Sequence, residues 1–182
     1  MLRISAMIII VFNCFYLDSQ AQISGFLESQ NLGRSGKITP AINIYANGSF
    51  SNSIGWFGWS STSRGWSEGY VGPTFSPASW LSLSASLGVE TADRPTRYSC
   101  WLWAGDKHLS FFLIQEDGGS GYWYRCVAKY IPTKSVSIGL MSERFTGIGP
   151  YMDVTILPLT IWGSMMWENG ERNSYVSLRM LF

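Results

Sequence analysis

The chain has 182 residues, of which 13 are Lys or Arg and 12 are Asp or Glu, so its formal net charge is +1. This near balance argues against a nucleic-acid partner and against a strongly basic membrane-surface patch. Only 14% of the residues are charged, below the roughly 25% of an ordinary soluble domain, whereas 15% are aromatic.

The first 21 residues have the pattern of a secretory signal peptide. Arg3 supplies the positive start, "AMIIIVFNCF" the short apolar run, and Ser19 and Ala21 the small residues before the cleavage point. An N-terminal membrane anchor is the alternative, but the apolar run is shorter than the roughly 20 residues of a spanning helix. A lipoprotein modified at Cys14 is disfavoured because bulky residues precede that cysteine. We therefore expect cleavage after Ala21.

Cleavage leaves residues 22–182, a length suited to a single domain. Short segments of alternating polarity follow one another, separated by turn residues, and none has the length of a transmembrane helix. This pattern predicts an all-β fold of about twelve strands, with ten as the fallback. Most segments are near the roughly 9–11 residues that a tilted strand needs to cross a bilayer. The expected strands are 23–31, 37–47, 50–61, 65–75, 79–90, 96–104, 107–115, 121–131, 135–144, 148–157, 159–168 and 172–182.

The stretch "WLSLSASLGVE" at residues 80–90 shows the alternation most clearly. Its leucines fall on one side and its serines on the other, which is typical of a strand with two unlike faces. The same apolar row recurs near residues 136–140 and 176–180. If the apolar rows face lipid, the lipid-facing side chains are Leu81, Leu83, Leu87, Val136, Ile138, Leu140, Val176, Leu178 and Met180.

A water-soluble barrel alternates too, with its apolar side chains inside. Here the opposite face is rich in Ser, Gly, Thr, Tyr and Trp instead of Lys and Glu, which favours lipid on the outside. Many aromatic residues also stand near expected strand ends, where the interfacial girdles of membrane barrels lie. These residues are Trp66, Trp80, Tyr98, Tyr122, Tyr130, Trp162, Trp167 and Tyr175. The sequence thus predicts a closed antiparallel transmembrane β-barrel, and a secreted soluble barrel is the alternative.

Two kinds of turn alternate along the chain, as they must when strands run up and down. A tight set is expected at Asn47–Gly48, Ser76–Pro77, Asp106, Pro132–Thr133 and Pro158. A more charged and somewhat longer set is expected at "LGRSGK", "TSRG", "TADRPT", "EDGGSG", "RFTGIG" and "ENGER". In outer-membrane barrels the tight turns face the periplasm and the longer ones face outside. Because proline cannot donate to a strand ladder, Pro40, Pro73 and Pro150 are expected near strand ends.

The chain ends in "YVSLRMLF", an amphipathic segment whose last residue is Phe182. This segment resembles the assembly signal of Gram-negative outer-membrane barrel proteins. The resemblance implies an outer-membrane location and recognition of the C-terminal strand by the barrel-assembly machinery. Twelve strands with short loops are also similar to the small monomeric porins for acidic sugars, and this likeness implies a transport function.

Extending the phase of the apolar rows places charged side chains in the barrel interior. These are Glu68, Glu90, Arg97, Arg125, Lys129, Glu143, Asp153 and Arg179. One interpretation is a narrow passive channel for small polar or anionic solutes, in which the basic groups attract anions and the carboxylates oppose them. The alternative is that the charges pair and plug the lumen. The barrel would then be structural, or would bind a partner through loops at Arg34, Arg64 and Arg94.

The sequence predicts no enzyme, metal site or cofactor. His108 and Ser110 resemble the His-x-Ser pair of outer-membrane lipid hydrolases, but Phe111 stands where those enzymes have Asn, and no third orienting residue is evident. The single histidine and the cysteines Cys100 and Cys126 have no metal-ligand spacing. Export would permit a disulfide, but another strand is expected between these two cysteines.

Overall fold

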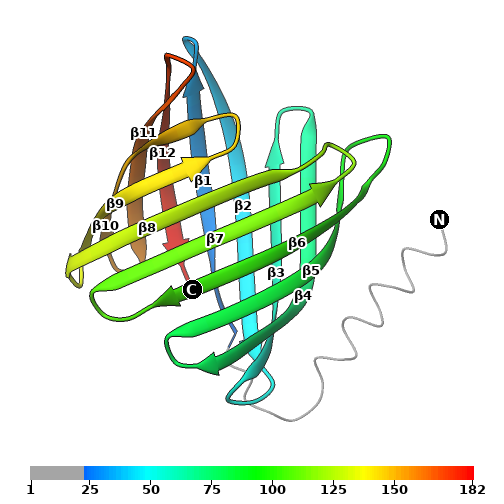
Figure 1. The fold of residues 1–182 in the computed structure, drawn as a ribbon, viewed down its shortest axis with the longest axis vertical. Helices are drawn as coiled ribbons and strands as arrows, with labels where there is room; N and C mark the ends of the chain where they lie inside the picture. Colours follow the sequence, from blue (N-terminus) through cyan, green and yellow to red (C-terminus); the bar gives the residue numbers. More distant parts are fainter. Residues whose placement is uncertain (1–22) are drawn as a thin grey trace.

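The computed structural model describes residues 23–182, which form a closed antiparallel barrel of twelve strands (Figure 1). Consecutive strands pair with each other, and the first pairs with the last. The strands are β1 (Ser24–Arg34), β2 (Lys37–Ser49), β3 (Ile54–Ser63), β4 (Trp66–Ala78), β5 (Leu81–Glu90), β6 (Thr96–Gly105), β7 (Leu109–Gly118), β8 (Trp123–Thr133), β9 (Val136–Glu143), β10 (Gly147–Ile156), β11 (Leu159–Glu168) and β12 (Glu171–Leu181).

The predicted all-β fold and the count of twelve are confirmed, and the ten-strand fallback is wrong. The predicted signal peptide, residues 1–21, lies outside the described residues. In the described part of the chain, no helix is long and apolar enough to cross a membrane.

The barrel closes where β1 meets β12. Phe26 pairs with Leu181, and the ladder continues to the pair of Arg34 with Asn173. The last residue extends this seam, because the N–H of Gly25 donates to the carbonyl of Phe182 at 2.9 Å and the N–H of Phe182 donates back at 3.1 Å. A Cβ at Gly25 would lie 2.1 Å from the carbonyl oxygen of Tyr45 and 2.8 Å from Cζ of Phe182, so the glycine admits both the neighbouring strand and the terminal ring.

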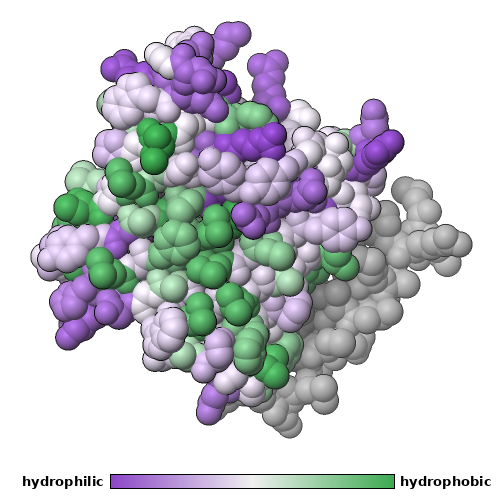
Figure 2. Space-filling model, viewed as in Figure 1, coloured by the Kyte–Doolittle hydropathy of each residue, from purple (hydrophilic) through white to green (hydrophobic). Residues whose placement is uncertain are grey.

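The distribution of polar and apolar side chains is the reverse of that in a water-soluble protein. Among residues 23–182, 18 buried side chains are polar or charged and only eight are hydrophobic. Every strand also carries at least one exposed large hydrophobic side chain. Figure 2 shows apolar side chains across the middle of one face, with hydrophilic ones toward the upper rim. An apolar exterior around a polar interior suits a barrel surrounded by lipid, and a soluble barrel does not fit it.

Seven of the nine residues expected to face lipid are exposed, while Leu81 and Val136 are half-buried. They alternate along their strands with inward residues such as Ser82 and Ser84, which line the interior cavity. Their contact with lipid itself stays a prediction.

The predicted tight turn at Asn47–Gly48 is wrong. Both residues lie within β2, where Asn47 pairs with Phe57, and the turn follows at residues 50–53. The cause is tertiary packing: a Cβ at Gly48 would lie 2.6 Å from Nε1 of Trp56, so the glycine admits the indole beside an extended strand.

The two sets of turns differ less in length than expected. The more charged set spans two to five residues and the other set two to four, because the strands extend into several of the expected loops. Ser35–Gly36 and Asn169–Gly170 have positive φ at both residues, as in the type I′ turns that join strands most tightly. Figure 1 shows the β1–β2, β3–β4 and β11–β12 turns at one end of the barrel and the C-terminus toward the other.

Three of the aromatic residues expected in the interfacial girdles point inward instead. Trp162 and Tyr175 are buried in a cluster with Met141, Tyr151 and Met166, where the Tyr151 and Trp162 rings stack at 5.6 Å. Trp66 lines the interior cavity. Nearness to a strand end does not decide the face, because a shift of one residue along a strand reverses it. The five others are exposed: Trp80, Tyr98, Tyr122, Tyr130 and Trp167.

The expectation that all three prolines lie near strand ends is wrong for Pro73. This residue is exposed in the interior of β4, and the β4–β5 register passes from Val71 directly to Thr74. The β10–β11 register likewise has no pair at Pro150. The barrel therefore accommodates these prolines by interrupting its ladder locally, as the missing N–H requires.

Candidate functional site

The barrel encloses a cavity of about 830 Å³ lined by inward side chains from the strands. Six of the eight charged residues expected in the interior line this cavity: Glu68, Arg97, Arg125, Lys129, Glu143 and Arg179. The other two, Glu90 and Asp153, are buried behind lining residues with which they form ion pairs. Which of these residues contact a solute stays a prediction.

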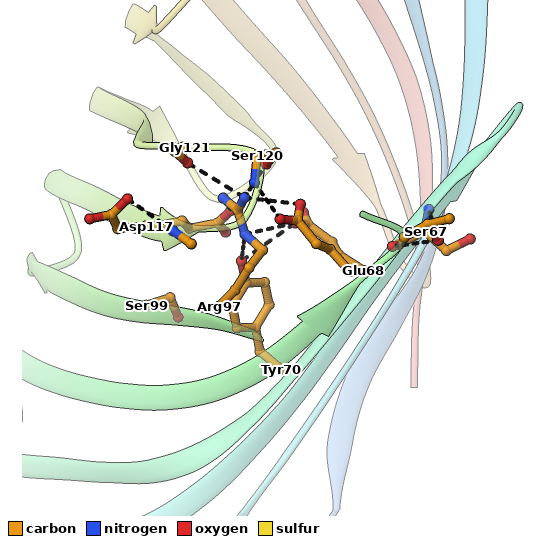
Figure 3. Close-up of polar contacts among 12 residues, drawn as sticks. Ser67, Glu68, Tyr70, Arg97, Ser99, Asp117, Ser120 and Gly121 are labelled. Carbon is orange, nitrogen blue, oxygen red and sulfur yellow. Dashed lines mark hydrogen bonds and ion pairs between the residues drawn. The ribbon is translucent and has the colours of Figure 1, made fainter. Parts of the chain in front are cut away.

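One charged group of the lumen, here called the Arg97 cluster, places a single guanidinium among three carboxylates (Figure 3). Arg97 Nη1 lies 3.0 Å from Glu90 Oε2, and Arg97 Nη2 lies 3.2 Å from Glu116 Oε2. Arg97 Nε lies 3.5 Å from Glu68 Oε2 and donates to the hydroxyl of Tyr70 at 2.5 Å. These four charged side chains are 5% exposed or less, so the cluster borders the cavity but exposes very little surface to it.

The Arg97 cluster also holds the turn between β7 and β8. Arg97 Nη1 donates to the hydroxyl of Ser120, and the N–H of Ser120 donates to Glu90 Oε1 at 2.6 Å. A Cβ at Gly119 would lie 1.7 Å from the carbonyl oxygen of Arg94, so only glycine allows this turn to lie against the β5–β6 connection. Strands β4 to β7 and the β7–β8 turn are thereby tied together at one end of the lumen.

A second charged group, here called the basic row, consists of Arg125, Lys129 and Arg179. Each of these side chains forms an ion pair with one acidic residue on another strand. The paired atoms are Arg125 Nε and Glu143 Oε2 at 2.6 Å, Lys129 Nζ and Asp153 Oδ2 at 3.1 Å, and Arg179 Nη2 and Glu28 Oε2 at 2.7 Å.

The basic groups are more exposed in the cavity than their acidic partners, of which Glu28 and Glu143 also line it. The basic side chains are 21%, 28% and 30% exposed, whereas the paired carboxylates are 5%, 7% and 3% exposed. Each carboxylate also accepts a hydrogen bond from a second side chain of the barrel interior. The hydroxyl of Tyr175 donates to Glu143 at 2.6 Å, that of Ser137 to Asp153 at 2.8 Å, and the indole N–H of Trp162 to Glu28 at 2.8 Å. In each pair of the basic row the positive group is therefore the more exposed one.

Aromatic side chains, here called the aromatic wall, fill another part of the lumen: Tyr45, Phe57, Trp59, Trp101 and Phe112. Trp101 of β6 lies with its ring centroid 4.5 Å from that of Phe57 of β3 and 6.0 Å from that of Tyr45 of β2. These contacts reach across β4 and β5, whose small side chains Thr74 and Ser84 line the same cavity and bond to each other at 3.0 Å. The regular serines of β5 thus leave space that aromatic rings from other strands occupy.

Sequence reasoning missed several of these residues. Glu116 was excluded because the expected strand ended at residue 115, whereas β7 continues to Gly118. Glu28 lies in "LESQN", where polar residues occur on both faces of the strand. The inward positions of β1 therefore cannot be distinguished from the outward ones by polarity. The aromatic wall was missed because aromatic residues occur on both faces of the strands.

The other candidate sites do not assemble in the described residues. His108 lies in the turn before β7, where its N–H donates to Asp106 Oδ1 at 2.7 Å, and Ser110 lines the cavity. Within residues 23–182, no three His, Cys, Asp or Glu side chains are placed to hold a metal ion. Cys100 and Cys126 are free thiols separated by β7.

Solved structures of small porins share this architecture. A structure of the KdgM porin superposes with a TM-score of 0.61 at 13% identity, covering 86% of this chain and 99% of that chain. The NanC porin gives a TM-score of 0.56 at 12% identity, with the same coverage of both chains. The chain has the fold of these porins. A membrane protein from a study of in-meso crystallization gives 0.64 at 10% identity, covering 87% of this chain and 83% of that chain.

No family model matches the chain, and no curated protein matches it in sequence. The porin-like architecture predicted from the C-terminal strand and the strand count is confirmed at the level of the fold.

Proposed function

We propose that this protein is an outer-membrane channel that passes small anionic solutes passively. The observation that carries the proposal is the unequal exposure within the basic row, whose positive groups are 21%, 28% and 30% exposed while their carboxylate partners are 5%, 7% and 3% exposed. A fixed positive charge on the wall of a narrow pore attracts anions and repels cations. One solved relative in fold is a KdgM porin in complex with oligogalacturonate, a chain of acidic sugars, which agrees with a lumen suited to anions.

The apolar exterior and the C-terminal Phe182 support an outer-membrane location reached after removal of residues 1–21. Phe182 is 58% exposed although its backbone closes the barrel, so its ring is accessible at the end of β12. The ring is therefore available to the barrel-assembly machinery. The proposal includes no catalytic step and no partner at the Arg34, Arg64 and Arg94 turns.

Interior packing favours a second function, a plugged barrel that stiffens the membrane or binds a partner. Met141 and Met166 are 1% and 0% exposed inside the barrel, and the charged side chains of the Arg97 cluster are buried as well. Side chains therefore occupy much of the lumen, and the remaining cavity decides whether ions pass.

The deciding experiment is single-channel conductance of refolded residues 22–182 in a planar bilayer, with folding confirmed by heat-modifiable gel mobility. Discrete steps with a reversal potential showing anion preference are expected. Removing one lumen charge with Arg125→Ala is expected to lower the anion-to-cation permeability ratio about fivefold, since a unit charge at 4 Å in water contributes about 1 kcal/mol.

Arg64→Ala is the matched control, because it removes the same charge from an exposed turn outside the lumen. Its permeability ratio should remain close to that of the parent chain. A folded protein that gives a silent bilayer would establish the plugged barrel instead.

A further inference from the structure

We propose that the cavity binds and passes anions that carry a flat apolar ring, with aromatic carboxylates as the simplest class. This inference rests on the proposed channel function and names the solutes that the lumen prefers. It follows from the position of the aromatic wall beside the basic row.

Ring contacts connect these two groups directly. The Arg179 guanidinium lies 4.1 Å from the centroid of the Phe26 ring, and Phe26 stacks on Tyr45 at 5.3 Å. Tyr45 in turn stacks near Trp101 at 6.0 Å. A solute ring held beside Phe26 and Tyr45 can therefore direct its carboxylate toward Arg179, and Trp101 extends the same row of rings.

The opposite edge of the aromatic wall also borders the basic row. Phe112 pairs in register with Val127 on β8, between Arg125 and Lys129. Both basic side chains, together with Phe112, line the cavity. Positive charge thus flanks the aromatic wall on two sides, so a bound ring has a counter-charge within reach at either edge.

Several polar groups near the aromatic wall are hydrogen-bonded to one another. The indole N–H of Trp101 donates to Ser99 at 2.9 Å, and the hydroxyls of Ser76 and Ser82 bond to each other at 3.2 Å. The hydroxyls of Ser86 and Ser99 are hydrogen-bonded as well. The aromatic wall therefore offers a solute ring surfaces, which favour stacking over hydrogen bonds to sugar hydroxyls.

Phe57 is the buried member of the aromatic wall, because it is 1% exposed and its ring centroid lies 4.5 Å from that of Trp101. Trp103, two residues along β6, also lines the cavity and is 37% exposed. Trp101 and Trp103 are therefore the residues that we expect to determine specificity, with Arg179 supplying the charge.

The test compares 1-naphthoate with galacturonate, two monoanions that differ in their rings. Binding to the folded protein in detergent is followed by isothermal titration calorimetry, and block or passage is followed by single-channel current. We expect 1-naphthoate to bind at least about tenfold more tightly than galacturonate, the size of effect that one stacked ring supplies.

Trp101→Leu and Arg179→Gln should each weaken 1-naphthoate binding about tenfold. If Trp101→Leu fails to fold, Trp103→Leu tests the same surface, because Trp103 has more of its ring exposed to the cavity. Trp80→Leu is the matched control: Trp80 is exposed on the barrel exterior, so its loss should leave binding unchanged.

Equal or tighter binding of galacturonate would overturn the inference, as would 1-naphthoate binding that is insensitive to both Trp101→Leu and Trp103→Leu. A conducting channel without ring preference would leave the proposed function standing and remove this inference. Ring-selective binding with a silent bilayer would do the reverse, supporting the ligand class and overturning the channel.

Discussion

The Arg97 cluster and the basic row are built from the same residue types but differ in stoichiometry and exposure. In the Arg97 cluster one guanidinium faces three carboxylates, and all four side chains are buried. In the basic row each cation has one carboxylate and keeps part of its surface in the cavity. The Arg97 cluster therefore has an excess of negative charge, which is buried. The basic row has balanced charge, and its positive groups are more exposed to the cavity than its carboxylates.

This difference assigns the two groups different roles. Buried ionic groups are sensitive to the loss of one partner, because the remaining charges then lie uncompensated in a medium of low dielectric constant. Exposed charges contribute less to stability but set the potential that a passing ion meets. We therefore expect changes in the Arg97 cluster to affect folding and changes in the basic row to affect selectivity.

Arg97→Leu should have the largest effect on stability. It leaves Glu68, Glu90 and Glu116 together without a cation and frees the β7–β8 turn. Removing one member of a buried charge network costs about 3–5 kcal/mol, so the free energy of unfolding in denaturant titrations of vesicle-embedded protein should fall by that amount. Arg97→Lys keeps the charge but not the forked geometry, and it should lose less. Unchanged stability in Arg97→Leu would mean that the cluster does not support the fold.

Glu143→Gln should separate stability from selectivity in the basic row. The carboxylate accepts hydrogen bonds from Arg125, Tyr175 and Thr146, and its loss should lower the free energy of unfolding by about 2 kcal/mol. The same change releases the positive charge of Arg125, so the anion preference in reversal-potential measurements should rise. A fall in anion preference would contradict the proposed role of this side chain.

The strands could be predicted from sequence because their cause is local. Alternation in "WLSLSASLGVE" reflects the pleat of one strand, and β5 occupies Leu81–Glu90 as that pattern indicates. The inward positions of Arg125 and Glu143 could be predicted from the same alternation, because each strand shows it independently of its neighbours. Pairing of these two side chains depends on the β8–β9 register, where they are direct partners.

Features that depend on distant strands could not be predicted in this way. Trp101 packs against Phe57 from three strands away, and the space for this contact comes from small side chains on β4 and β5. Trp162 faces inward for a similar reason, since its partners Tyr151 and Tyr175 come from both neighbouring strands. The composition of one strand carries no signal of either arrangement.

Salt concentration offers a test of the same comparison without mutation. The Debye length falls from about 10 Å at 0.1 M to about 3 Å at 1 M salt, and exposed charges are screened more than buried ones. The anion preference conferred by the basic row should therefore decrease severalfold between 0.1 and 1 M KCl, while the stability contributed by the Arg97 cluster should change little. Reversal potentials and denaturant midpoints measured in parallel at both concentrations would show the two responses. A parallel loss of both would mean that the cluster is open to solvent.

Glu116→Gln should have the smallest effect and provides the sharpest contrast with Glu143→Gln. The Oε1 atom of Glu116 is buried and has no hydrogen-bond partner among the described residues, and its carboxylate adds to the excess of negative charge around Arg97. The amide keeps the shape of the side chain and removes one of three competing charges. The free energy of unfolding should therefore change by less than about 1 kcal/mol or increase slightly, because an unpaired buried charge opposes folding. A loss as large as that of Glu143→Gln would show that Arg97 needs all three carboxylates, and the distinction between the two groups would then lie in exposure alone.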